Sequence, residues 1–363
     1  MNWIDNANHL IGLFKCELNE FNTKNRIAAF DLDDTIIIST KSNTEDYMLY
    51  NNEIINKLRD CNTNYRIVIV TNQNGIEKGY LDKQTWINKI SALCKQIDVP
   101  LLVLVSLHND CYRKPRTGLF IGYVKYYKKT SFFCGDAGGL GKRKIYEMSI
   151  KKDFSDTDIK FSYNLGIRFM HRDEFIYNIK YETISVKYPV DFNKILIGNY
   201  DEFMENHIEL VLMVGFPGSG KSYYARKYVE PKGYQYVSQD VCKTLLKCLK
   251  ECELGLKNGL SVVCDNTNPT IEVRKKYIEL AKKYDVKCRV IIIDADKFMS
   301  VHNNIYRHCL SMKINKIIPM VAYNKYNKVY VKPSLEEGFY QIDLIPFKLS
   351  PDVNVKDYFK YYF

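Results

Sequence analysis

The sequence predicts an α/β protein made of two doubly wound domains. The first observation is the length, because 363 residues at roughly 100–200 residues per domain suggest two domains. The second is that apolar, β-branched runs alternate with segments of helical period in both halves, which is typical of parallel sheets covered on both faces. The third is the composition of 46% hydrophobic and 26% charged residues, which excludes extensive disorder.

The expected elements follow from these runs. In the first half, strands are predicted at residues 26–32, 66–71, 101–107 and 131–135, and the helical spacing of Trp86, Ile90, Leu93 and Ile97 predicts a helix between the second and third strands. In the second half, strands are predicted at 209–215, 261–264 and 289–294, and helices at 222–229, 240–258 and 271–283. Each half therefore has the same alternating plan.

The stretch at 181–206 has weak periodicity and a mixed, polar character, so we expect the domain boundary there. The predicted organisation is a short extension at 1–23, a first domain at 24–180, a linker at 181–206 and a second domain at 207–363.

Net charge is +11, from 53 Lys and Arg against 42 Asp and Glu. Residues 1–200 hold 28 basic and 23 acidic side chains, so both halves of the chain are basic. A polyanionic partner for each half explains this excess, and so does a lysine-rich solvated surface. Charge alone leaves both interpretations open.

Cysteine usage and apolar runs indicate the compartment. The eleven cysteines are an odd number without a CxxC pair, and the first residues show no secretory signal. The apolar runs fall short of the ~20 residues that a membrane-spanning helix needs. We therefore expect a soluble intracellular protein with free thiols and no membrane association.

Acidic residues follow the first predicted strand. In DLDDT, Asp31 and Asp33 alternate along extended backbone and can point the same way at the carboxyl end of the strand, whereas Asp34 should face away. Two such carboxylates suit phosphoryl transfer, one as nucleophile and the other as proton shuttle and metal ligand. An acidic strand cap would produce the same letters, so the motif needs support.

Three later segments supply that support. Thr71 ends the second strand, where its hydroxyl can bond a phosphoryl oxygen, and Lys114 in YRKPRTG can neutralise charge on that group. Asp136 follows another strand in GDAGG and offers a further oxygen ligand for Mg²⁺. Asp153 and Asp156 are additional acidic residues near the metal whose roles stay open.

The order of these segments resembles the haloacid-dehalogenase-like phosphatases. That resemblance implies that Asp31 is the nucleophile, Asp33 the general acid and base, Thr71 and Lys114 the phosphate binders, and Asp31, Asp33 and Asp136 the metal ligands.

A phosphate-binding loop opens the second domain. Residues 215–222 read GFPGSGKS after a predicted strand, which fits GxxxxGK[ST] in its required context. The predicted nucleotide-binding residues are Gly215, Pro217, Gly218, Ser219, Gly220, Lys221 and Ser222. Lys221 should reach the β- and γ-phosphates, and the Ser222 hydroxyl should bind Mg²⁺.

Further residues favour a kinase over other nucleotide hydrolases. Asp240 can accept the proton of an attacking hydroxyl, although a helix N-cap explains it as well. Asp265 ends a strand in a Walker-B-like position, and Arg307 lies where small P-loop kinases carry lid arginines, or is a solvated helix residue. Lys243 is a candidate contact for a substrate phosphate, with a surface lysine as the alternative.

The combination resembles the bifunctional polynucleotide kinase 3′-phosphatases. The segments that carry the resemblance, in the order of that family, are TNQNGI, YRKPRTG, GDAGG, KKDFSDTD, NLGI, VGFPGSGKS, CDNTNP, HNN and PSLEEGFYQIDLIPFKL. The resemblance spans about residues 24–349. It implies removal of a 3′-phosphate through an aspartyl phosphate and phosphorylation of a 5′-hydroxyl by ATP with Mg²⁺, leaving DNA ends that a ligase can seal.

The chain departs from that family in two places. Animal members begin with a forkhead-associated domain, and here only about two dozen residues precede the phosphatase. The family's lid resembles HNNRFR, whereas Ile305 stands where the first arginine would be, so that Arg307 remains. The basic clusters at 142–144 and 151–152 flank the phosphatase motifs, and we expect them to track a nucleic-acid backbone.

Three alternatives stay open at this point. RNA ends are the alternative substrate, although phage-type RNA repair enzymes place the kinase first. A strand-end binding protein that has lost catalysis is another, and enzymes acting on free nucleosides or sugar phosphates are the third. A monomer is expected, because no helical oligomerisation seam is evident.

Overall fold

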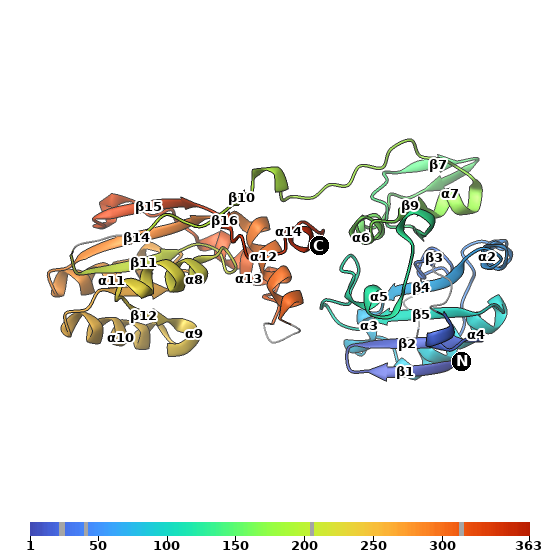
Figure 1. Cartoon of the computed structure of the whole chain (residues 1–363), viewed down its shortest axis with the longest axis horizontal. Helices are drawn as coiled ribbons and strands as arrows, with labels where there is room; N and C mark the ends of the chain where they lie inside the picture. Colours follow the sequence, from blue (N-terminus) through green and yellow to red (C-terminus); the bar gives the residue numbers. More distant parts are fainter. Residues whose placement is uncertain (22–25, 40–42, 204–206, 312–315) are drawn as a thin grey trace. The chain divides into compact units, whose positions relative to one another are not determined.

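The computed structural model describes residues 1–21, 26–39, 43–203, 207–311 and 316–363. The chain divides into two compact units (Figure 1). The first comprises Met1–Tyr188 together with Lys360–Phe363, and the second comprises Pro189–Phe359. Each unit is built on an α/β sheet, as the sequence predicts.

The first unit contains a seven-stranded sheet. Its strands, in spatial order, are β1 (Asn2–Asn6), β2 (His9–Phe14), β5 (Leu101–Ser106), β4 (Arg66–Asn72), β3 (Ile27–Phe30), β6 (Phe132–Gly135) and β9 (Arg168–His171). The strands from β5 to β9 run parallel, whereas β1 and β2 are antiparallel to their neighbours. The carboxyl ends of five parallel strands therefore lie at one edge.

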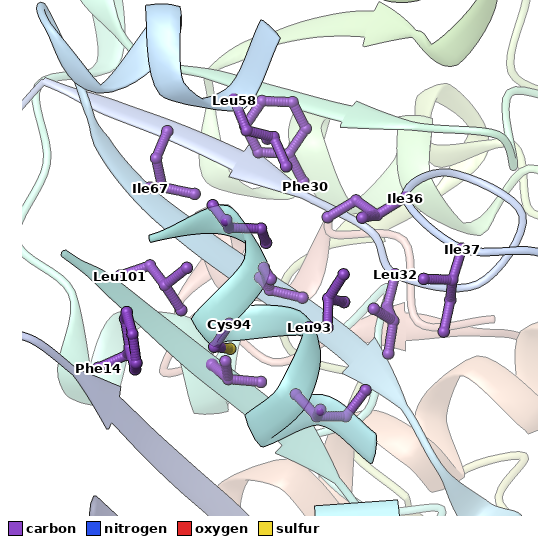
Figure 2. Close-up of a cluster of buried hydrophobic side chains, with 14 of the residues drawn as sticks. Phe14, Phe30, Leu32, Ile36, Ile37, Leu58, Ile67, Leu93, Cys94 and Leu101 are labelled. Carbon is purple, nitrogen blue, oxygen red and sulfur yellow. The ribbon is translucent and has the colours of Figure 1, made fainter. Parts of the chain in front are cut away.

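Helices cover both faces of this sheet. On one face, α2 (Ile54–Asn62) and α4 (Lys83–Ile97) pack on alternate strand residues such as Phe30 and Ile67 (Figure 2). On the other face, α5 (Gly118–Tyr123) and α6 (Thr157–Leu165) pack on the residues between them, such as Ala29 and Val68. The four apolar residues that predicted a helix at 86–97 are all buried in α4, so that prediction is confirmed.

The structure places residues 2–14 within the sheet, not in an extension. Every residue of β2 is buried, because the strand pairs with β5 and is covered on both faces. The edge strand β1 then pairs with β2. The expected boundary between residues 23 and 24 lies outside the described residues.

The second unit contains five parallel strands. Their spatial order is β12 (Gln235–Ser238), β13 (Val262–Asp265), β11 (Glu209–Val214), β14 (Lys287–Asp294) and β15 (Gln341–Pro346). On one face α10 (Leu245–Lys257) and α11 (Ile271–Lys283) form the core. On the other face the core includes Tyr224, Ala225 and Val229, from the segment that follows the glycine-rich loop.

Two predicted helices of this unit are interrupted. The helix expected at 240–258 is divided into α9 (Gln239–Cys242) and α10, because Lys243 adopts a left-handed conformation with φ of 69° and Thr244 caps α10. The helix expected at 222–229 begins as α8 (Lys221–Tyr224) and continues as a π-helical turn over Ala225–Val229. Periodicity alone does not reveal such breaks.

The boundary between the two units lies within residues 181–206. The units divide between Tyr188 and Pro189, inside the segment expected as a linker, and β10 (Leu196–Ile197) pairs with β16 (Lys348–Leu349) of the second unit. The last four residues of the chain belong to the first unit. There Arg116 Nε donates to the carbonyl oxygen of Tyr362 at 3.1 Å, which fixes this tail.

Further α-helices and strands complete the two units. They are α1 (Leu18–Phe21), α3 (Asn74–Glu77), β7 (Arg143–Ile145), β8 (Met148–Ile150), α7 (Arg172–Tyr177), α12 (Lys297–Leu310), α13 (Met320–Val329) and α14 (Val355–Tyr358). Among the residues that the structure describes, no helix has the length and apolar character needed to cross a membrane.

Candidate active sites

The first site lies at the carboxyl ends of three neighbouring strands. Asp31 follows β3, Thr71 lies near the end of β4, and Asp136 follows β6. Because β4, β3 and β6 are parallel neighbours, these three ends meet at one edge of the sheet. The topology thus brings together residues that are up to 105 positions apart in the sequence.

A cluster of carboxylates forms there around one buried lysine. Oxygens of Asp31, Asp136 and Asp158 all lie within 4.8 Å of one another. Lys114 Nζ donates to Asp31 Oδ1 at 2.5 Å and to Asp158 Oδ1 at 2.8 Å. Since Lys114 is only 4% exposed, its charge depends on these partners.

Three carboxylates around one ammonium leave an excess of negative charge. Burial, followed by the neighbouring acids, raises the pKa of Asp31 well above its usual value, with Lys114 opposing the change. Burial and the charge of Asp158 raise the pKa of Asp136 to about 6. Burial lowers the pKa of Lys114, but the attraction of Asp158 and Asp31 outweighs it and leaves that pKa raised.

A divalent cation fits this cluster. Carboxylate oxygens are the ligands that Mg²⁺ prefers, and a cation there would offset the excess charge of the three acids. Asp31, Asp136 and Asp158 would hold it.

Asp158 is a member of the cluster that the sequence analysis missed. It lies in the first turn of α6, and its Oδ2 accepts a hydrogen bond from Ala137 N at 3.1 Å. A Cβ on Gly135 would lie 2.2 Å from that same oxygen, so the glycine makes the approach of Asp158 to the strand end feasible. The sequence feature that could have identified Asp158 is its place as the third aspartate of DFSDTD, at the start of a helix.

The other two aspartates of that segment have different surroundings. Asp156 forms an ion pair with Lys160 at 2.9 Å. The carboxylate of Asp153 accepts hydrogen bonds from the backbone N–H groups of Gly138 and Leu140, in the loop that follows Asp136. Neither belongs to the carboxylate cluster.

The carboxylate of Asp33, expected as a metal ligand, also lies outside the cluster of described residues. Its Oδ2 accepts a hydrogen bond from Gln73 Nε2 at 2.6 Å, and the same amide nitrogen donates to Thr71 Oγ1 at 2.9 Å. Burial raises the pKa of Asp33, with the Gln73 hydrogen bond opposing the shift. A raised pKa favours the role of general acid that the sequence analysis expects for Asp33.

Neighbouring residues position the rest of the site. The side chain of Asn72 accepts from Lys114 N at 2.9 Å and donates to Lys114 O at 3.2 Å, which fixes the loop that carries the lysine. Asp34 adopts a left-handed conformation with φ of 55°, and its carboxylate accepts from Ser39 N at 3.0 Å. Asn72 and Asp34 are thus engaged in local backbone contacts.

The second site is formed by the glycine-rich loop between β11 and α8. Gly218 and Gly220 have φ of 80° and 99°, a region that residues with a Cβ rarely adopt. A Cβ on Gly218 would also lie 2.5 Å from the Ser300 carbonyl oxygen. Both positions therefore require glycine, as a phosphate-binding loop does.

Lys221 bonds to its own loop. Its Nζ donates to the carbonyl oxygens of Gly215 at 2.9 Å and Phe216 at 2.6 Å. Burial lowers the pKa of Lys221 to about 8, with Asp265 and Asp240 opposing the shift. A buried cation with neutral acceptors is suited to an incoming anion.

A cavity of about 470 Å³ joins the loop to the other predicted kinase residues. Its lining includes Lys221, Ser222, Asp240, Asp265, Lys243 and Arg307. Asp240 and Ser222 are exposed, whereas Asp265 is buried and accepts a hydrogen bond from the Tyr236 hydroxyl at 2.6 Å. The structure thus brings Asp240, Asp265 and Arg307 to the same cavity as the loop residues Lys221 and Ser222, whereas the Ser219 side chain is buried.

Two asparagines hold the segments around this cavity in place. Asn266 Oδ1 accepts from Gln239 N at 2.7 Å, at the start of the helix that carries Asp240. Asn303 Nδ2 donates to the Gly218 carbonyl oxygen at 3.0 Å and fixes the glycine-rich loop. Ile305 is only 5% exposed, so this position of α12 faces the core while Arg307 lines the cavity.

Family models match a large part of each unit. Residues 26–176 match the family model of the polynucleotide kinase 3 phosphatase, and residues 210–309 match an AAA domain model.

Relatives match across both units. A protein of Acanthamoeba polyphaga mimivirus, assigned as a bifunctional polynucleotide phosphatase/kinase, is 35% identical over 96% of this chain and 90% of its own length. The bifunctional polynucleotide phosphatase/kinase of Schizosaccharomyces pombe is 32% identical over 94% of this chain and 84% of its own. The polynucleotide 3′-phosphatase ZDP of Arabidopsis thaliana is 26% identical over 42% of this chain and 24% of its own. The chain belongs to the family of bifunctional polynucleotide phosphatase/kinases, which combine a polynucleotide 3′-phosphatase with a 5′-kinase.

Proposed function

We propose that this enzyme repairs DNA strand breaks, removing 3′-phosphates through an aspartyl phosphate on Asp31 and phosphorylating 5′-hydroxyls with ATP. The observation that carries the phosphatase chemistry is the buried ion pair of Lys114 with Asp31, beside the acids that would hold Mg²⁺. The basic charge of both halves of the chain suits a polyanionic strand at each site.

In the first phosphatase step, Asp31 attacks phosphorus and the bond to the 3′-oxygen breaks. Asp33 donates its proton to that leaving oxygen, which its raised pKa and burial support. Lys114 and Thr71 bind the phosphoryl oxygens. Bound Mg²⁺ would supply positive charge against the developing negative charge on phosphorus.

In the second step, Asp33 takes a proton from water, and the resulting hydroxide attacks the aspartyl phosphate. The bond between phosphorus and Asp31 breaks, inorganic phosphate leaves, and the carboxylate is restored. One residue thus acts first as acid and then as base, which the Gln73 hydrogen bond favours by holding the Asp33 carboxyl in place.

In the kinase site, Asp240 accepts the proton of the 5′-hydroxyl as its oxygen attacks the γ-phosphorus of ATP and ADP leaves. We expect Lys221 to exchange its loop carbonyls for the β- and γ-phosphates, with Arg307 stabilising charge in the transition state. Ser222 and Asp265 would hold the Mg²⁺ of the nucleotide. A second cavity of about 330 Å³ shares Lys221 and Arg307, and its apolar lining, including Tyr306 and Phe347, fits the base.

The test is a nicked DNA duplex with 3′-phosphate and 5′-hydroxyl ends, incubated with Mg²⁺ and γ-labelled ATP and resolved on a denaturing gel. We expect loss of the 3′-phosphate and labelling of the 5′ end, faster than on the matching RNA strand. Faster RNA processing would assign RNA end repair instead. Equal rates on free nucleotides would assign a small-molecule enzyme, and inactivity at both ends would leave a binding protein. The proposed partners are DNA ends and a ligase that seals those ends afterwards. The enzyme itself is proposed to act as a monomer.

A further inference from the structure

A basic hairpin of the first unit lies in the chain between Asp136 and Asp158, two members of the carboxylate cluster. We define it as residues 141–154, comprising β7, β8 and the loop up to Phe154. Two aromatic side chains are exposed on it, Tyr146 at 73% in the turn and Phe154 at 99%. A single exposed aromatic residue is ordinary, but two on one short segment that also carries strong charge are typical of a binding surface.

The exposed charge on this hairpin is mostly positive. Four exposed lysines share the segment with one exposed acidic residue, Glu147. These lysines are Lys142, Lys144, Lys151 and Lys152. Lysines interleaved with aromatic rings are the combination by which proteins hold single-stranded nucleic acid, with cations on the phosphates and rings on the bases.

Both ends of the hairpin connect to the carboxylate cluster. The chain enters it five residues after Asp136, and Phe154 stands four residues before Asp158. The segment therefore leaves the cluster at one acid and returns to it at another. A strand bound on this hairpin would lie close to the reacting phosphate.

Buried ion pairs fasten the hairpin to the loop behind Asp136. Asp153 Oδ2 accepts from Leu140 N at 2.9 Å, and Arg143 Nη1 donates to Asp153 Oδ1 at 2.8 Å. Arg143 Nε also donates to Asp173 Oδ2 at 2.6 Å. Because Asp153 and Asp173 are almost fully buried, these pairs hold the base of the hairpin while its lysines and rings face solvent.

We propose that the basic hairpin binds the strand that ends in the 3′-phosphate, with Phe154 and Tyr146 stacking on unpaired bases and the lysines contacting backbone phosphates. This inference rests on the proposed function of the phosphatase site. Bases that are paired and stacked in a duplex have no face to offer. The enzyme therefore prefers single-stranded or frayed 3′ ends to blunt duplex ends.

The test compares Phe154→Ala with the wild-type enzyme on three substrates: a single-stranded oligonucleotide with a 3′-phosphate, a blunt duplex, and thymidine 3′-phosphate. We expect kcat/KM on the single strand to fall by roughly 10-fold, because the variant cannot form one of the base–aromatic stacks. The decrease on thymidine 3′-phosphate, which lacks neighbouring bases, should be several times smaller.

Tyr127→Ala is the matched control. Tyr127 is 60% exposed and lies before β6, at the amino end of the strand whose carboxyl end carries Asp136. It should behave as wild type on all three substrates.

A second variant removes the four hairpin lysines and is tested by the salt dependence of strand binding. The slope of log K against log salt should fall by about 0.7 for each backbone phosphate that a lysine no longer neutralises. An unchanged slope together with unchanged Phe154→Ala rates would overturn the proposal and favour a protein partner for this surface. Equal decreases on oligonucleotide and nucleotide would also overturn it, because Phe154 would then only support the fold. Wild-type enzyme inactive on every strand would instead refute the proposed function.

Discussion

The two sites differ in the contacts of their buried lysines before any ligand is bound. In the phosphatase site, the buried cation is the Lys114 ammonium, and its partners are the carboxylates of Asp31 and Asp158. In the kinase site, Lys221 bonds to backbone carbonyls, and Asp240 and Ser222 face a cavity of about 470 Å³. The charged groups of the phosphatase site are thus paired with one another before the substrate binds. In the kinase site, we expect the nucleotide to supply the charged partner of Lys221.

The difference follows from what each site buries. A buried ammonium requires compensation, and buried carboxylates provide it fully in the first site, where the pKa of Lys114 is raised despite its burial. In the second site the acceptors of Lys221 are neutral oxygens of its own loop, and burial lowers the pKa of Lys221 to about 8. The positive charge of Lys221 is therefore the one that a bound phosphate would stabilise more, and phosphate is the ligand that such a loop binds.

Two buried histidines show the same contrast. Burial lowers the pKa of His171 in the first unit, but hydrogen bonds and attraction from Asp153 and Asp173 outweigh it and leave the pKa raised. In the second unit, burial lowers the pKa of His302 to about 4, and the hydrogen bond with the Tyr358 carbonyl oxygen opposes this shift only in part. One histidine therefore favours its charged form and the other its neutral form.

The largest expected effect is the loss of 3′-phosphatase activity in a variant that retains 5′-kinase activity. Asp31→Asn removes the nucleophile at nearly constant volume, and we expect 3′-phosphatase kcat to fall by roughly 10⁴–10⁶-fold. The 5′-kinase rate of the same preparation should stay within about twofold, because Asp31 lies in the other compact unit. Both rates come from one gel assay on the nicked duplex. Retained phosphatase activity would show that another residue is the nucleophile.

The reciprocal variant is Asp240→Asn. Removing a general base should lower the kinase kcat by about 10²–10⁴-fold while ATP binding and the phosphatase rate are maintained. Asp240 is exposed, so the thermal unfolding midpoint should not change. A variant that loses ATP affinity but keeps kcat would place Asp240 at the nucleotide instead of the hydroxyl.

The next prediction concerns acid stability. In the unfolded chain His302 titrates near 6.5, and in the folded chain near 4, so the unfolded state binds more protons between these values. The stabilisation by the neutral ring is fully present above pH 6.5 and is lost as pH falls toward 4, by roughly 3 kcal/mol.

Calorimetry of the full chain between pH 7.5 and 4.5 measures this loss. The transition of the second unit should move to lower temperature on acidification. His302→Gln keeps a donor for the Tyr358 carbonyl oxygen, and it should flatten this dependence. The same dependence in wild type and variant would mean that another group titrates.

The smallest expected effect is a change in KM from substitutions in a lysine-lined cavity next to the kinase site. A cavity of about 550 Å³ is lined by Lys243, Lys247 and Lys250, and Lys243 also lines the cavity that contains Asp240. If the strand with the 5′-hydroxyl lies there, Lys247→Ala with Lys250→Ala should raise KM for oligonucleotides while kcat stays the same. The salt slope of KM should decrease by about 1.4 for the two lysines. Unchanged values would leave these lysines as solvated surface residues.

Local sequence patterns determined much of this protein. The alternating strands and helices gave the α/β class, and GFPGSGKS located a loop whose left-handed Gly218 and Gly220 are local requirements. Asp31 and Asp136 were also recognisable, because each directly follows an apolar strand and strand ends meet at one edge of a parallel sheet. These features depend only on neighbouring residues and on general rules of sheet topology.

Tertiary structure decided the remainder. That Asp158 and not Asp33 completes the carboxylate cluster depends on how α6 packs on β6 and on the missing side chain of Gly135. The membership of β1 and β2 in the sheet depends on pairing with β5, about ninety residues later in the chain. Neighbours in sequence do not carry such information, because burial and ion pairing are set by residues that only the folded chain brings into contact.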